Sequence, residues 1–129
     1  MLAVDTNVVV RLLVVDDEKQ ARRARSLFAE NRIFVSNTVL LETEWVLRST
    51  YGLPRDRVQS HLMELAGLPQ VTLESPERIA SALEWFGSGM DFADALHLAG
   101  AEQCSEFATF DRKLTVAAKK AGAGKIRVL

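Results

Sequence analysis

The sequence predicts an α/β domain with a mainly parallel sheet, because short apolar segments alternate with longer amphipathic segments along the chain. Hydrophobic residues make up 48% of the 129 residues, which is enough for a sizeable core and too many for a disordered chain. No internal repeat, low-complexity tract or linker interrupts this alternation. We therefore expect a single domain that covers residues 1–129.

Proline and glycine residues mark the expected boundaries. Pro54 stands where a helix would start, Gly67 and Pro69 mark its end, and Pro76 opens the next helix. We expect strands at Leu2–Val4, Ile33–Val35, Val71–Leu73, Glu106–Thr109 and Ile126–Val128. We expect helices at Thr6–Leu13, Asp17–Glu30, Asn37–Tyr51, Arg55–Gly67, Pro76–Phe86, Asp91–Gln103 and Arg112–Ala121.

The composition excludes few classes of partner. The formal net charge of −1 argues neither for nor against a nucleic-acid ligand, so any basic face must be local. The single cysteine, Cys104, excludes an internal disulfide framework and suits a reducing compartment. The N-terminus lacks a basic region, and Arg11 breaks an apolar run that is far shorter than the roughly 20 residues of a membrane span. These features predict a cytoplasmic protein without a membrane segment.

Four carboxylates occupy apolar segments in which solvent exposure does not explain them: Asp5 in LAVDTN, Glu42 in VLLETEWVL, Asp94 in DFADALHLA and Asp111 in FATFD. Acids in such settings repel one another and are costly to bury, and a divalent cation is the simplest way to neutralise a cluster of them. Carboxylate ligands suit Mg²⁺ or Mn²⁺. One cysteine and two scattered histidines do not make a usual zinc site.

The predicted elements place some of these acids near one another. Asp5 follows the first strand and Asp111 follows the fourth, and ligands of parallel α/β sheets bind at the carboxyl ends of strands. If those two strands are neighbours, both carboxylates reach the same crevice. Glu42 shares a helical face with apolar residues and has no cation within helical reach, whereas Glu44 has Arg48 four residues later. We therefore interpret Glu44 as an ordinary ion-paired acid and Glu42 as a site residue.

Helix capping is the alternative role for several of these acids. Asp5 and Asp111 each precede a predicted helix and are competent N-caps. Asp91 and Asp94 are three residues apart at a helix start, where acids are favoured by the helix dipole, and both remain candidates for one ligand position. Thr109 could hydrogen-bond a carboxylate or a water molecule, or be an ordinary strand residue.

Four segments together resemble the PIN-domain ribonucleases, and among them the VapC-type toxins of bacterial toxin–antitoxin systems. They are LAVDTNVVVRLL, FVSNTVLLETEWVLRSTYG, MDFADALHLAGA and FATFDRKL, in this order and spacing. The resemblance covers nearly the whole chain and implies a five-stranded parallel sheet flanked by helices. It also implies that Asp5, Glu42, Asp94 and Asp111 are the catalytic, metal-binding acids, and that Thr6 and Thr109 are the hydroxyl residues beside the first and last acid.

This resemblance implies an Mg²⁺- or Mn²⁺-dependent endoribonuclease that hydrolyses RNA phosphodiester bonds. It further implies a homodimer and inhibition by a small antitoxin protein whose tail enters the acidic groove. Arg112 and Lys113 adjoin Asp111 and could hold an RNA backbone, although a solvated face explains most basic residues. The alternative function is a non-catalytic binding module in which the acidic groove accepts an arginine of a partner protein.

Overall fold

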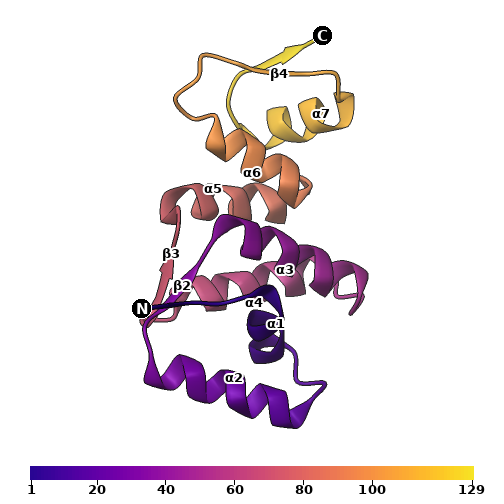
Figure 1. Ribbon diagram of the computed structural model, residues 1–129. Helices are drawn as coiled ribbons and strands as arrows, with labels where there is room; N and C mark the ends of the chain where they lie inside the picture. Colours follow the sequence, from indigo (N-terminus) through magenta and orange to yellow (C-terminus); the bar gives the residue numbers. More distant parts are fainter. The chain divides into compact units, whose positions relative to one another are not determined.

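The computed structural model describes residues 1–129 and divides into two compact units, Met1–Pro76 and Glu77–Leu129 (Figure 1). The expected single domain remains a prediction. The first unit contains β1 (Leu2–Ala3), α1 (Thr6–Leu13), α2 (Glu18–Glu30), β2 (Ile33–Val35), α3 (Asn37–Ser49), α4 (Arg55–Gly67) and β3 (Val71–Leu73). The second contains nearly all of α5 (Pro76–Gly87), then α6 (Phe92–Gly100), β4 (Phe107–Thr109), α7 (Arg112–Ala121) and β5 (Ile126–Val128).

All the predicted helices and strands are present, and their order is confirmed. The ends differ most in α3 and α6, which stop at Ser49 and Gly100 instead of Tyr51 and Gln103. Helix α7 ends at Ala121 because Gly122 adopts a left-handed conformation with φ of 66°, and its N–H donates to the carbonyl groups of Ala118 and Lys119.

The first unit is organised around β2, the central strand of a parallel sheet with the order β1-β2-β3. Ile33 pairs with Leu2 on one side and with Val71 on the other. Ile33 and Val35 are both completely buried, as expected for a central parallel strand covered on its faces. Since all three strands run in the same direction, the residues that follow them share one edge of the sheet.

The second unit contains a separate two-stranded sheet in which β4 pairs with β5 in parallel, with Phe107 opposite Ile126 and Thr109 opposite Val128. The prediction of one five-stranded sheet is therefore wrong: the strands form sheets of three and two. In particular, β1 pairs only with β2, and β4 pairs only with β5. The strands have only two or three residues each, so each ladder contributes few hydrogen bonds and apolar packing dominates each unit.

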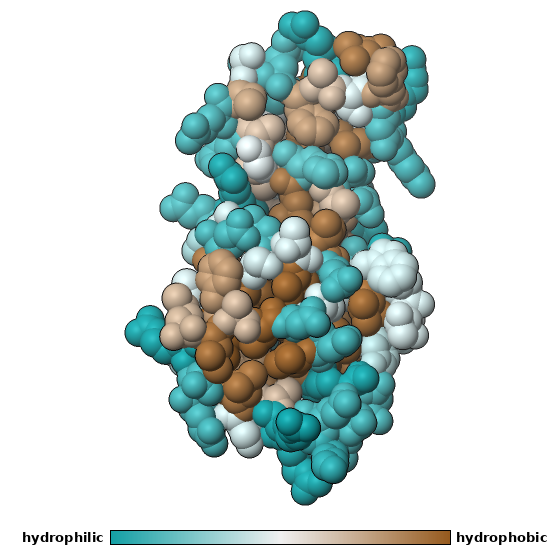
Figure 2. Space-filling view, in the orientation of Figure 1, coloured by the Kyte–Doolittle hydropathy of each residue, from teal (hydrophilic) through white to brown (hydrophobic).

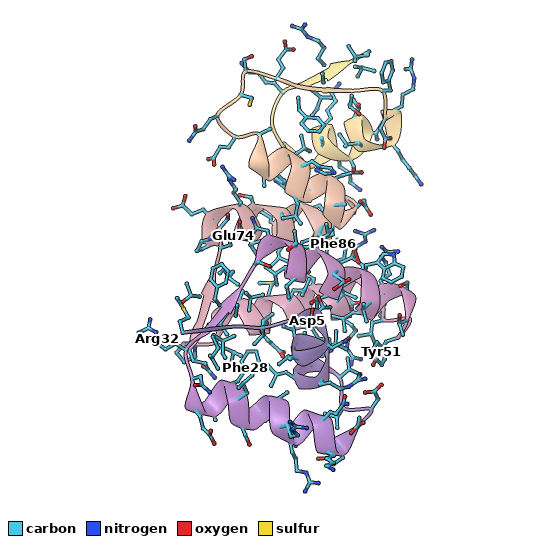
Figure 3. All side chains as sticks on the ribbon, viewed as in Figure 1. Asp5, Phe28, Arg32, Tyr51, Glu74 and Phe86 are labelled. Atoms are coloured by element: carbon cyan, nitrogen blue, oxygen red, sulfur yellow. The ribbon has the colours of Figure 1, made fainter.

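A polar network ties α1 to the end of α3 in the first unit. The Arg11 guanidinium donates to Asp16 and to the Tyr51 hydroxyl, both at 3.0 Å, and its Nε donates to Gln20 at 2.6 Å. Tyr51, labelled in Figure 3, in turn donates to Asp16 at 2.6 Å. This hydrogen bond is the main reason that the pKa of Asp16 is lowered and that of Tyr51 is raised. The network holds the loop between α1 and α2 in place.

The core of the second unit contains an edge-to-face pair of aromatic rings. Phe86 of α5 and Phe92 of α6 have ring centroids 5.5 Å apart and an interplanar angle of 77°. Both side chains are almost completely buried.

In the first unit, Figure 2 shows a group of apolar side chains on the visible face, bordered by hydrophilic ones. None of the helices combines the length and the apolar character that crossing a membrane requires.

Candidate functional site

The predicted site residues are divided between the two units. Asp5, Thr6 and Glu42 belong to the first unit, and the others belong to the second, namely Asp91, Asp94, Thr109, Asp111, Arg112 and Lys113. Within neither unit do three or more histidine, cysteine, aspartate or glutamate side chains form a group that could hold a metal ion. The convergence of all four acids on one pocket therefore stays a prediction, and each half of the candidate site has its own geometry.

Asp5 lies between the end of β1 and the start of α1 (Figure 3). It occupies the N-cap position, and one of its carboxylate oxygens accepts the N–H of Thr6 at 2.7 Å. An N-cap side chain normally accepts from the second or third helical residue, so this contact with the first satisfies little of the helix end. The other carboxylate oxygen forms no hydrogen bond. Asp5 is exposed and keeps the capacity to bind a ligand.

Thr6 has a hydroxyl group without a partner in a buried position. The residue is only 4% exposed, and its Oγ1 forms no hydrogen bond. Burying a hydroxyl without a partner costs free energy, and the few such groups in folded proteins often lie at functional sites. Its place directly after Asp5 agrees with the supporting role that the resemblance implies for it.

The carboxyl edge of the first sheet holds a further acid, Glu74, which is not among the predicted site residues. Glu74 follows β3 and accepts the backbone N–H of Asn37, the first residue of α3, at 3.0 Å (Figure 3). Asn37 also donates its side-chain amide to Ser75 at 3.1 Å, while its Oδ1 is buried without a partner. The position of Glu74 at a strand end was the available signal. Its carboxylate stabilises the N-terminus of α3, the helix that carries Glu42.

The burial of the two glutamates of α3 is the reverse of what the sequence suggested, because Glu44 is buried and Glu42 is exposed. The predicted ion pair is confirmed, since Arg48 Nε lies 2.9 Å from Glu44 Oε2. However, Glu44 is only 2% exposed, whereas Glu42 is exposed and forms no hydrogen bond or ion pair. The reason is helical periodicity, because Glu44 belongs to the buried stripe formed by Leu40, Thr43 and Leu47. Glu42 is thus a free carboxylate, as a ligand requires, but not a buried one.

Asp91 and Asp94 lie at the start of α6 in different roles. Asp91 is the N-cap, and its carboxylate accepts the N–H of Asp94 at 3.2 Å. Asp94 is half-buried and forms no hydrogen bond through its own carboxylate. Burial raises the pKa of Asp94, and the negative charges of Asp91 and Asp111 raise that pKa further, while His97 opposes them. The pair therefore divides into a capping acid and a free acid that lies in a negative field.

Asp111 caps α7 and contacts Thr109 through its backbone. Its Oδ1 accepts the N–H of Leu114 at 3.0 Å, and its own N–H donates to the Thr109 hydroxyl at 2.9 Å. The capping alternative is thus correct for Asp111, but its second carboxylate oxygen forms no hydrogen bond. The Thr109 hydroxyl fixes the turn between β4 and α7 and so orients the Asp111 carboxylate.

The donor groups fit a hard divalent cation. Asp5 and Asp111 each keep one oxygen without a hydrogen bond, and Asp94 keeps both. Burial and the charges of Asp91 and Asp111 raise the pKa of Asp94, and a cation bound beside Asp94 would stabilise its ionised form. Arg112 and Lys113 are exposed next to Asp111 and form no ion pair, so their charges are available to an anionic ligand.

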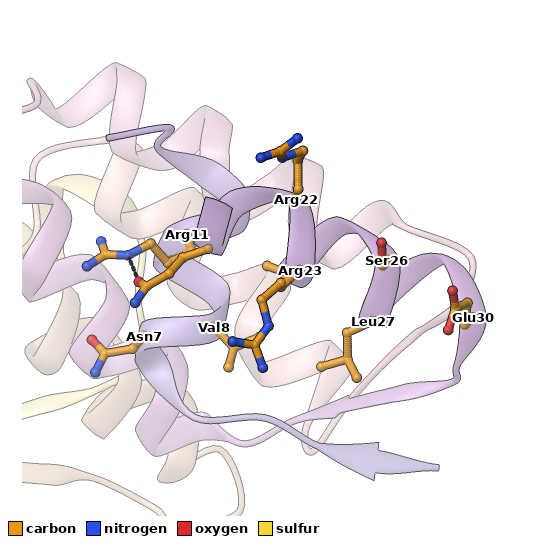
Figure 4. Close-up of a pocket in the computed structure, with 10 residues that line it drawn as sticks. Asn7, Val8, Arg11, Arg22, Arg23, Ser26, Leu27 and Glu30 are labelled. Atoms are coloured by element: carbon orange, nitrogen blue, oxygen red, sulfur yellow. Dashed lines mark hydrogen bonds between the residues drawn. The ribbon is translucent and has the colours of Figure 1, made fainter. Parts of the chain in front are cut away.

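A separate groove lies between α1 and α2 and contains none of the predicted acids (Figure 4). It has a volume of about 660 Å³ and is lined by Val8 and Leu27 among its apolar residues. Arg22 and Arg23 of α2 also line it, as do Arg11 and Gln20, which are joined by a hydrogen bond. The groove can accept an apolar segment that carries negative charge.

Comparison with known proteins gives one family match. The family model described as the PIN domain matches residues 2–120. Among curated proteins, no significant relative was found. The match includes all four predicted acids and stops at residue 120, within the second unit.

Replacing Asp94 should relieve repulsion, and the effect should depend on pH. Because the folded state raises the pKa of Asp94, its ionised form lowers stability at neutral pH, and this penalty disappears below the ordinary value of 3.8. We expect Asp94→Asn to melt at the same or a higher temperature than the original protein at pH 7 in EDTA, with no gain at pH 3. Thermal melts at both pH values, with Asp56→Asn as an exposed first-turn control, test this. Clear destabilisation by Asp94→Asn at pH 7 would contradict it.

Replacing Asp111 should separate capping from ligand binding. Asp111→Ala removes the acceptor of the Leu114 N–H and should cost about 1 kcal/mol of unfolding free energy. The unfolding free energy of Asp111→Asn should differ from that of the original protein by roughly a few tenths of a kcal/mol, because asparagine caps a helix about as well as aspartate. Urea denaturation of the two variants measures the difference. Equal stability of the alanine and asparagine variants would show that the cap contributes nothing.

Proposed function

Because the chain belongs to the PIN-domain family, whose members are generally nucleases that use divalent metal ions, we propose that it is an Mg²⁺- or Mn²⁺-dependent endoribonuclease. The observation that carries the proposal is the state of Asp94. This half-buried carboxylate has no hydrogen-bond partner, and its pKa is raised by burial and by the charges of Asp91 and Asp111. Repulsion and burial make the ionised carboxylate unfavourable in such a field, and a bound cation would neutralise it.

The residues take distinct roles in this proposal. Asp5, Glu42 and Asp94 are the main metal ligands, and Asp111 either binds a second ion or orients the attacking water. The free carboxylate oxygens of these residues support the assignment. When bound, a divalent ion would supply Lewis acidity for hydrolysis of a phosphodiester bond. Asp91 holds the start of α6 and thereby places Asp94, since its carboxylate accepts the Asp94 N–H.

The RNA backbone would be held by the basic side chains next to Asp111. Arg112 and Lys113 follow Asp111 directly and are exposed without ion pairs. Lysine and arginine contacts to phosphates supply affinity without selecting a sequence. The Thr109 hydroxyl supports this region by accepting the Asp111 N–H.

We further propose that the protein is the toxin of a toxin–antitoxin pair, forms a homodimer and acts in the cytoplasm. The groove between α1 and α2 supports a peptide partner, because its apolar lining and the adjacent Arg22 and Arg23 suit an apolar segment with acidic residues. The rival function is the binding module without catalysis. Tight partner binding without RNA cleavage in Mg²⁺ or Mn²⁺ would favour that rival.

Neutral replacements of the ligand acids should abolish cleavage. We expect Asp5→Asn and Asp94→Asn to lower the rate of RNA cleavage at least about 100-fold, because each removes a charged ligand of the metal. Cleavage of a mixed RNA substrate should require Mg²⁺ or Mn²⁺ and stop with EDTA. Circular dichroism of each variant serves as the folding control. Full cleavage by a folded Asp5→Asn, Asp94→Asn double variant would end the nuclease proposal.

The two glutamates of α3 form a matched test. Glu42→Ala should change unfolding free energy by less than about 0.5 kcal/mol, because the side chain is exposed and unpaired, yet it should remove cleavage. Glu44→Ala should leave cleavage intact. It should lower the unfolding free energy by about 1–3 kcal/mol, since it deletes a buried side chain and its ion pair with Arg48. Denaturation and cleavage assays are run on both variants. Loss of cleavage only in Glu44→Ala would show that the assignment of the two residues is inverted.

A further inference from the structure

A second cavity lies entirely within the second unit, and Asp91, Asp94 and Asp111 are not among the residues that line it. It has a volume of about 240 Å³ and is bordered by α5, the end of α6, the start of β4 and the segment before β5. Phe107 begins β4 and Lys125 precedes β5, so the cavity lies at the amino end of this strand pair. Asp111 follows the opposite end of β4. Within the second unit, the cavity is therefore separate from Asp111, and Asp94 does not line it.

The size and lining of this cavity suit one flat group. Its volume of about 240 Å³ is below the range of roughly 300–1,000 Å³ typical of pockets for larger ligands. Two half-buried aromatic side chains, Trp85 and Phe107, line it, and the buried Leu98 and Ala99 also line it. Aromatic side chains offer stacking surfaces to planar rings.

The charges at the cavity favour an anionic ligand. Arg78 and Lys125 line it, both are exposed, and neither side chain forms a hydrogen bond or an ion pair. Glu106 also lines the cavity, but its charge is offset by the ion pair with Arg127. Glu102 is the other acid in the lining, and its carboxylate can accept a hydrogen bond from an amino group of a base. A planar ring joined to a phosphate combines the features that this lining recognises.

We propose that this cavity binds one unpaired nucleotide of the RNA, with the base against Trp85 or Phe107 and a phosphate near Arg78 and Lys125. Bases of single-stranded RNA stack on aromatic side chains while cations hold the backbone. This inference rests on the proposed ribonuclease function and extends it. Leu98 follows Asp94 by four residues, which is about 6 Å along α6, and the cavity lies at the end of β4 opposite to Asp111. The nucleotide in the cavity is therefore not the one that is cleaved but a neighbour along the strand.

The chain contains two tryptophans, so a Trp45→Phe background leaves Trp85 as the only one and makes it a reporter of the cavity. The probes are adenosine 5′-monophosphate and a five-nucleotide adenosine RNA, titrated in EDTA so that no cleavage occurs. We expect saturable quenching of Trp85 fluorescence by both probes, because a stacked base changes the surroundings of the indole ring. Ribose 5-phosphate, which has the phosphate but no base, should produce no saturable quenching.

Variants of the two cations test the phosphate contact. In the Trp45→Phe background, the double variant Arg78→Ala, Lys125→Ala should bind the RNA about tenfold more weakly and with a smaller salt dependence. The matched control is Lys119→Ala, Lys120→Ala, which removes two exposed charges of α7 outside the cavity and should leave affinity unchanged. All four side chains are exposed, so the variants should fold, which circular dichroism checks.

The outcomes separate this subsite from the nuclease proposal. Absence of saturable quenching, equal binding of ribose 5-phosphate, or an equal loss in both double variants would overturn the nucleotide subsite. Metal-dependent cleavage measured on the same preparation reports on the nuclease proposal independently. Quenching that depends on Arg78 and Lys125 supports the subsite even if cleavage is absent, and cleavage without quenching supports the nuclease and overturns the subsite.

Discussion

Burial of the central strand β2 is the constraint on which the first unit depends. Ile33 and Val35 are fully buried, and β2 pairs in parallel with a strand on each side. Parallel pairing forces the chain to leave all three strands at the same edge, which is where Asp5 and Glu74 lie. The polar chemistry at this edge therefore follows from the packing of apolar residues beneath it. The unpartnered hydroxyl of Thr6 adds to that polarity.

Helix starts are the second recurring feature of the candidate site. Asp5, Asp91 and Asp111 are all N-caps, and Asp94 lies in the first turn of α6. Backbone N–H groups at these positions hold one carboxylate oxygen and lower the cost of keeping a negative charge there. The remaining oxygens stay free for a cation. Capping is thus compatible with the proposed metal binding, because the backbone contact fixes the orientation of the carboxylate.

Local signals predicted the elements well because they depend on neighbouring residues. Pro54, Gly67 and Pro76 marked boundaries of α4 and α5, and Gly122 ended α7 through its left-handed conformation. Pairing between strands was predicted less well, and one sheet of five strands was replaced by sheets of three and two. Such short strands carry little information about their partners, since each contributes only two or three residues to a ladder.

Sequence by itself determined the order of helices and strands, the family and the candidate acids, because spacing and residue type are properties of the chain. The PIN-domain family model matches residues 2–120 of the sequence. Only the tertiary structure decided that Glu44 is buried and Glu42 exposed, that Glu74 joins the edge of the first sheet, and that Asp94 lies in the field of Asp111. Burial and charge interactions depend on atoms from distant segments, and their distances are set by packing rather than by sequence separation.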